Sequence, residues 1–165
     1  MIKRAIACAA VFLTVATSTS AAAAGPVVLF YDASQAQEFG AALADNDYWW
    51  SGYAKHVRLD DVRKSRNPGR VVVRFVASDS MPAAGSIGPI RPDSPTAVIP
   101  LSRAAVGQGH YDRRVVAREY GRVWGLAPTS DGRCDRIMSG PSAGPQCKKF
   151  RWERSEVDLI DNNYR

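Results

Sequence analysis

The chain has 165 residues, with 22 Lys and Arg against 16 Asp and Glu, which gives a formal net charge of +6. The basic residues are scattered among carboxylates without a run of five or six, which argues against a nucleic-acid-binding protein. A chain of this length with 45% hydrophobic residues can bury the core of one domain.

The first 24 residues have the three parts of a secretory signal peptide. Lys3 and Arg4 precede an apolar stretch, and small residues end at Ala24. The stretch is shorter than the roughly 20 residues that span a bilayer, so a retained anchor is the weaker alternative. We expect 1–24 to be removed, which lowers the net charge from +6 to +4. A secreted, extracellular, monomeric domain over 25–165, out of contact with the membrane, should remain.

The mature chain is predicted to open with a strand followed by a helix. Val27–Tyr31 is a β-branched and aromatic run typical of a strand. Asp32 and Ser34 are residues that commonly begin helices, and the pattern after them predicts a helix over Gln35 to about Trp50. The aromatic cluster Tyr48–Trp50 is expected to pack the far end of this helix against a sheet.

Three further strands are predicted from short apolar runs, at His56–Leu59, Val71–Ala77 and Val98–Leu101. Pro100 places the last of them at the edge of the sheet. The segment Ser78–Pro95 is dense in Pro, Gly and Ser, and is interpreted as an exposed loop. Its position before the edge strand makes it a candidate rim of a cleft.

The best-defined helix has Asp112 as its expected cap and Gly125 where a left-handed terminating residue belongs. Its apolar stripe has helical spacing and consists of Val116, Tyr120, Val123 and Trp124. A closing helix is predicted from about Trp152 to Asn162, with Val157 and Ile160 facing the core.

Two cysteines lie between these last helices. Cys8 leaves with the signal peptide, so Cys134 and Cys147 enter an oxidising compartment as an even pair, and we expect one disulfide. It would close a loop rich in Gly, Pro and Ser and stabilise the fold by roughly 3 kcal/mol. Together the elements predict an α+β fold, with a small twisted mixed sheet, three helices and one disulfide loop.

Two segments carry a resemblance to a known family. Ala117–Leu126 reads A-R-E-Y-G-R-V-W-G-L, and the segment between the cysteines reads C-D-R-I-M-S-G-P-S-A-G-P-Q-C. This resembles the snapalysin family of small secreted zinc endopeptidases, whose helix reads A-H-E-x-G-H-x-x-G-L-P-D before a disulfide loop with C-x-x-x-M-S-G. The resemblance covers most of residues 27–163, weakly over 60–105, and implies a zincin-like domain. Matching positions are Glu119, Gly121, Gly125, Leu126, Met138, Ser139 and Gly140.

The metal-binding positions implied by the resemblance are substituted. Arg118 and Arg122 stand where the family has two histidine ligands, and Pro128 aligns with the third ligand, an aspartate. Only Glu119, at the family's general-base position, remains. A guanidinium group stays protonated and offers a metal no lone pair. Each one about 4 Å from a dication would repel it by on the order of 8 kcal/mol at an effective dielectric constant of 20. We therefore expect no zinc cofactor.

A rebuilt metal site is a weaker alternative. The two histidines, His56 and His110, do not share the helix face of Glu119, although Asp131 or Asp135 could contribute oxygen ligands. An active metalloendopeptidase with such a remodelled site is the rival function. Decay without any function is a third possibility that the sequence leaves open.

The substituted residues suggest two roles for the old metal site. Arg118 and Arg122 lie one helical turn apart, and Glu119 can approach both. The three form either a self-neutralising ion-pair cluster or a site where the arginines bind a carboxylate or phosphate of a peptide or protein ligand. Met138 would form an apolar floor below them, as the resemblance implies. The sequence therefore predicts a secreted, inactive metalloprotease homologue with a peptide- or anion-binding cleft.

Overall fold

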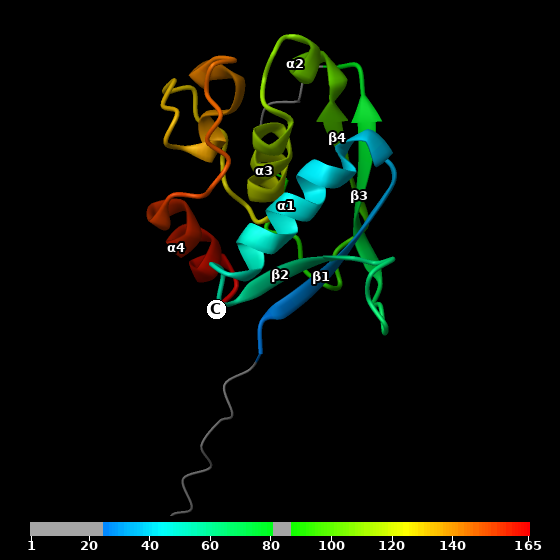
Figure 1. Cartoon of the computed structure of the whole chain (residues 1–165). Helices are drawn as coiled ribbons and strands as arrows, with labels where there is room; N and C mark the ends of the chain where they lie inside the picture. The colour runs from blue at the N-terminus through cyan, green and yellow to red at the C-terminus, as the bar shows by residue number, and fades with distance from the viewer. Residues whose placement is uncertain (1–24, 81–86) are drawn as a thin grey trace, which may run out of the picture.

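The computed structural model describes residues 25–80 and 87–165 (Figure 1). In chain order the elements are β1 (Val27–Gln35), η1 (Gln37–Phe39), α1 (Gly40–Ser51), β2 (Val57–Asp61), β3 (Val71–Ser78), β4 (Ala97–Ser102), α2 (Arg103–Gly107), α3 (Asp112–Val123), η2 (Ile137–Ala143) and α4 (Arg154–Asn163). The predicted signal peptide, 1–24, lies outside the described residues and stays a prediction. None of the helices in the described part is long and apolar enough to cross a membrane.

The sheet has four strands in the order β2-β1-β3-β4, and each neighbouring pair is parallel. The general α+β class is confirmed, whereas the prediction of a mixed sheet is wrong for the described strands. Hydrophobic alternation reports which face of a strand is buried, and it carries no information about strand direction. Direction follows from the connections, and the helix α1 between β1 and β2 returns the chain to start a parallel neighbour.

The strands bury one face of the sheet. In β1 the inward side chains are Leu29, Tyr31 and Ala33, each at most 1% exposed. This alternation carries β1 past the predicted end at Tyr31 to Gln35, so Asp32 lies within the strand and starts no helix. The helix α1 begins only at Gly40. Strand β4 lies at the edge of the sheet, which confirms the position predicted from its proline.

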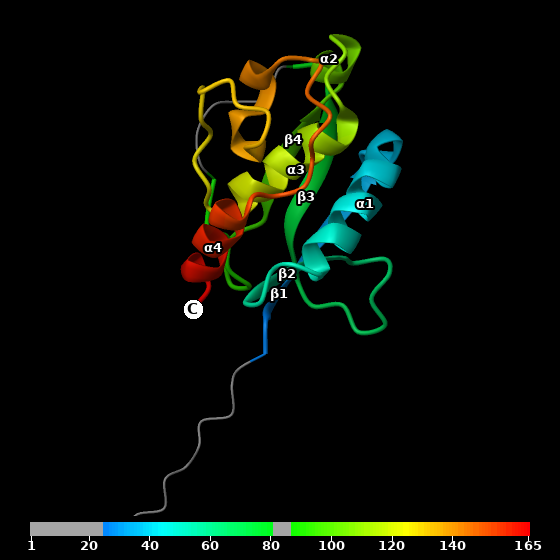
Figure 2. The same cartoon turned by 60° about the vertical axis from the view of Figure 1, so that its left-hand side comes forward.

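Aromatic side chains join the helices to this buried face. Helices α1 and α3 lie side by side in both views (Figures 1 and 2), and the indole rings of Trp50 and Trp124 stack between them with centroids 3.9 Å apart. Trp152, just before α4, meets both rings edge-on. The prediction that Tyr48 packs against the sheet is wrong, because its side chain is 73% exposed.

Residues 25–80 and 87–165 form one more α-helix than the three predicted. Helix α2 spans five residues, too few to give a periodic pattern, and the hydroxyl of Ser102 accepts a hydrogen bond from the Ala105 N–H at 3.0 Å to cap it. In α4 the predicted burial of Val157 and Ile160 is confirmed, at 3% and 0% exposure.

Helix α3 ends as predicted but begins differently. Gly125 adopts a positive φ of 88° after the last turn, as expected of a terminating residue. The prediction that Asp112 caps the helix is wrong, because Tyr111 occupies the N-cap position and Asp112 is the first helical residue. Its carboxylate accepts a hydrogen bond from the neighbouring Arg113 N–H at 2.7 Å and still lies where the helix dipole favours negative charge.

Part of the predicted exposed loop over 78–95 packs against the core. Its residues 81–86 lie outside the described part of the chain. Ile90 is 4% exposed, its N–H donates to the carbonyl of Val123 at 2.9 Å, and its own carbonyl accepts from the Tyr164 hydroxyl at 2.7 Å. The described half of the loop therefore joins the end of α3 to the C-terminal segment.

Candidate functional site

The candidate site is an ion-pair cluster on the buried middle of α3. Arg118 Nη1 donates to Glu119 Oε1 at 2.6 Å, and Arg122 Nη1 donates to Glu119 Oε2 at 2.5 Å. Glu119 is fully buried, and the two arginines are 7% and 5% exposed. The predicted approach of the three charged groups is confirmed. Arg122 lies three residues after Glu119 on the same helix face, and the long Arg118 side chain reaches the carboxylate from the adjacent position.

The electrostatics of the cluster are dominated by burial. Burial raises the pKa of the Glu119 carboxyl, while the two guanidinium groups act in the opposite direction. Arginine stays protonated in either case. With two guanidinium groups and one carboxyl, the three residues carry a net positive charge whether Glu119 is ionised or neutral.

This donor set does not fit a metal cation. Both carboxylate oxygens of Glu119 already accept hydrogen bonds from guanidinium groups, which themselves have no lone pair for a metal. Pro128, at the third ligand position implied by the resemblance, is half-buried and has no ligating side chain. Over residues 25–80 and 87–165, no three His, Cys, Asp or Glu side chains gather as a metal ion requires.

The residues considered for a rebuilt metal site are not brought together with Glu119, apart from His110. His56 lies before β2 and donates its N–H to Asp161 at 3.1 Å. Asp131 accepts from the Ser139 hydroxyl at 2.5 Å, and Asp135 is paired with Arg133. Of these four residues, only His110 lines a small cavity that Glu119 also lines.

Met138 lies directly beneath α3. A side-chain carbon added at Gly121 would fall 2.4 Å from the Met138 sulfur and 2.5 Å from the Trp152 ring, so only glycine permits this approach. The carboxylate of Glu156 holds the turn in place by accepting the N–H groups of Ile137 and Met138 at 3.2 and 3.0 Å. Met138 thus belongs to the apolar core beneath the helix, while its role as the floor of a ligand site stays a prediction.

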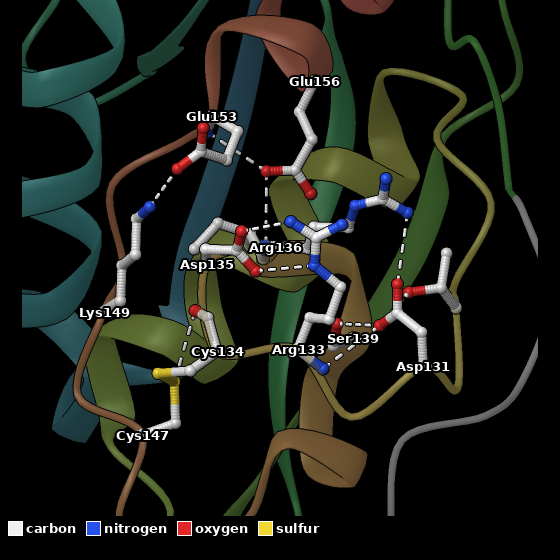
Figure 3. A network of polar contacts seen from close by, with 12 residues as sticks. Asp131, Arg133, Cys134, Asp135, Arg136, Ser139, Cys147, Lys149, Glu153 and Glu156 are labelled. Carbon is white, nitrogen blue, oxygen red and sulfur yellow. Dashed lines mark hydrogen bonds and ion pairs between the residues drawn. A yellow bond between two sulfur atoms is a disulfide. The ribbon is translucent and has the colours of Figure 1, made fainter.

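The disulfide loop is fixed to α3 by a side chain that sequence reasoning missed. Cys134 and Cys147 form the predicted disulfide, with Cα atoms 5.5 Å apart, beside a network of surface ion pairs (Figure 3). The guanidinium of Arg114 donates to the carbonyls of Cys134, Lys149 and Arg136 at 3.1, 2.8 and 2.6 Å. No sequence signal could have found this, because its partners are main-chain oxygens.

A small hollow opens beside the cluster. Its cavity volume is about 10 Å³, which is room for about one water molecule. Charged, aromatic and small apolar side chains line it, and they come from α2, the segment between α2 and α3, α3 and η2. The lining residues are Ala105, His110, Tyr111, Arg114, Val115, Arg118, Glu119, Gly140 and Pro141.

Comparison with known proteins gives a distant relationship. The chain is 28% identical over 135 residues to an extracellular small neutral protease of Streptomyces coelicolor, covering 82% of this chain and 58% of that protein. It is 28% identical over 148 residues to the protein of the same name from Streptomyces lividans, covering 88% and 60%. The chain thus spans about three fifths of the length of these relatives. No family model matches it.

Proposed function

We propose that this chain is a secreted, snapalysin-like protein that does not hydrolyse peptide bonds and that uses its altered site to bind an anionic or peptide ligand. One observation carries the proposal: Glu119, at the family's general-base position, is fully buried with both oxygens bound to guanidinium groups. The extracellular location named for the two relatives supports secretion.

The loss of proteolysis follows from what hydrolysis requires. A zinc endopeptidase needs a Lewis acid to polarise the carbonyl and a carboxylate with a free lone pair to accept a proton from water. Arg118 and Arg122 supply no metal ligand, and they occupy the carboxylate that would act as the base. Both parts of the reaction are therefore removed by the same two substitutions.

The binding function rests on what the substitutions add. The three residues carry net positive charge in a buried environment, where an anionic ligand gains more than it would in bulk water. Guanidinium groups bind carboxylates and phosphates with strong, directional hydrogen bonds. A peptide C-terminus or an acidic side chain would supply such a group.

Metal analysis of the purified protein, together with an assay of casein hydrolysis, tests the loss of activity. We expect less than a tenth of a zinc ion per chain and no chelator-sensitive cleavage. One zinc per chain with chelator-sensitive cleavage would instead establish the alternative, an active extracellular zinc metalloendopeptidase with a remodelled site. The names of the relatives favour that alternative.

Restoration of the ligand set tests the scaffold. The triple variant Arg118→His, Arg122→His, Pro128→Asp should bind one zinc ion and regain cleavage, because it returns three neutral or anionic donors around Glu119. The matched control carries the two histidines but keeps Pro128, and it should bind zinc more weakly. A triple variant that folds and binds no zinc would refute the assignment of these positions to a former metal site.

A further inference from the structure

Two buried nitrogens of residues that line the hollow, Arg114 Nε and Arg118 Nε, lack a hydrogen-bond partner among the described residues. Arg118 Nε is buried and makes no hydrogen bond to any described residue, while the Nη1 of the same side chain is paired with Glu119. Such orphaned donors are uncommon in folded proteins, because each one loses its water without compensation. An acceptor from outside the chain would satisfy it.

The backbone beside Arg118 leaves room for its side chain. Gly140 has a positive φ of 54°, and a side-chain carbon there would fall 2.5 Å from Arg118 Nε and 2.6 Å from its Cδ. Both residues line the hollow. A side chain at this position would clash with Arg118, so the glycine permits Arg118 to lie beside the hollow.

The charge of the lining favours an anion. Arg114 and Arg118 both line the hollow, and Glu119 is its one acidic residue. The Arg114 guanidinium is held by three main-chain carbonyls, and burial lowers its pKa. Two arginines therefore line the space with one acidic residue, whose carboxylate is shared with Arg122.

The size and the remaining walls narrow the class of anion. A cavity volume of about 10 Å³ admits about one oxygen-sized group, so a phosphate would leave its other charged oxygens against the remaining walls. Ala105, Val115 and Pro141 give the rest of the lining an apolar character. A planar carboxylate can place one oxygen in the hollow and its short apolar stem against these walls.

We infer that the hollow between α2, α3 and the turn at Gly140 binds a single carboxylate group, which accepts a hydrogen bond from Arg118 Nε. The inference rests on the proposed function and narrows its ligand from anions in general to a carboxylate. The group can come from a free short-chain acid or from an acidic residue of a peptide, since both present the same oxygens.

Titration of the wild-type protein with small anions at constant ionic strength tests the inference. Acetate and N-acetyl-aspartate represent the free acid and the peptide side chain, and chloride and phosphate are the controls. We expect saturable binding of at least one carboxylate, measured by calorimetry or by NMR shifts of the α3 amides, and no saturable binding of phosphate. Equal binding of chloride, or binding of no carboxylate, would overturn the inference.

Two lysine variants locate the site. Arg118→Lys keeps a positive charge near Glu119 and removes the Nε donor, so carboxylate affinity should fall at least tenfold. Arg113→Lys is the matched control, because Arg113 lies on the same helix, pairs with Asp45 and does not line the hollow, and its affinity should stay within threefold. Equal losses in both variants would contradict the assignment. If Arg118→Lys fails to fold, the discrimination between anions by the wild type decides.

The two proposals fail in different ways. A zinc-free, inactive protein that binds no carboxylate would leave the proposed loss of proteolysis standing and would remove only the carboxylate site. A zinc-loaded, active protein would remove the proposed function itself.

Discussion

Replacement of Glu119 by Gln separates a structural ion-pair cluster from a catalytic carboxylate. The glutamine has nearly the same shape but no charge, so it leaves two buried guanidinium groups without an anion. Breaking a buried ion pair by removing one partner costs about 3–5 kcal/mol. At about 3 °C per kcal/mol for a domain of this size, the midpoint of thermal unfolding should fall by roughly 10–15 °C.

The assay is thermal unfolding followed by tryptophan fluorescence, because Trp50 and Trp124 are stacked in the core. The matched control is Asp158→Asn, which breaks the exposed pair with Arg154, where the side chains are 57% and 80% exposed. Exposed pairs contribute about 0–1 kcal/mol, so this variant should unfold near the wild-type midpoint. Equal midpoints for Glu119→Gln and Asp158→Asn would show that the buried cluster does not stabilise the fold.

Three further predictions concern stability. Burial raises the pKa of Asp47 from 3.8 to about 6, so between these values the folded state holds a proton that the unfolded state releases. The free energy of unfolding should therefore fall by up to about 3 kcal/mol as the pH rises from about 4 to 6. Asp47→Asn should flatten this part of a curve of stability against pH. Joint replacement of Cys134 and Cys147 by Ser should lower the free energy of unfolding by about 3 kcal/mol in urea, because the bond closes a loop with a sequence separation of 13, and an unchanged midpoint would contradict this account. Gly121→Ala should lower that free energy by about 1–3 kcal/mol, since its methyl group meets a methionine sulfur and an indole ring, whereas Gly107→Ala meets nothing within 4 Å and should be tolerated.

The sequence located most elements of the fold but not the direction of its strands. All four strands and three of the helices lie where periodicity placed them, with ends that shift by a few residues. The parallel order β2-β1-β3-β4 depends on how connections cross the sheet, and alternation within a strand contains no record of that. Helix α2 escaped prediction because five residues make little more than one turn.

By itself the sequence determined the identity of the charged cluster. The spacing of Arg118, Glu119 and Arg122 on one helix places their head groups together, because the geometry of an α-helix is independent of the rest of the fold. The pairing of Cys134 with Cys147 was likewise predicted only from the number of cysteines outside the expected signal peptide and from the expected compartment.

Only the tertiary structure decided what surrounds that cluster. Segments far apart in the chain supply the glycine that packs against Arg118 and the three carbonyls that hold Arg114. The same packing leaves Arg118 Nε without a hydrogen-bond partner among the described residues. Every residue has a main-chain carbonyl and glycine has no side chain, so the amino-acid sequence does not indicate these contacts. A local pattern fixes which groups meet along one helix, whereas packing between segments fixes which of their atoms remain without a partner.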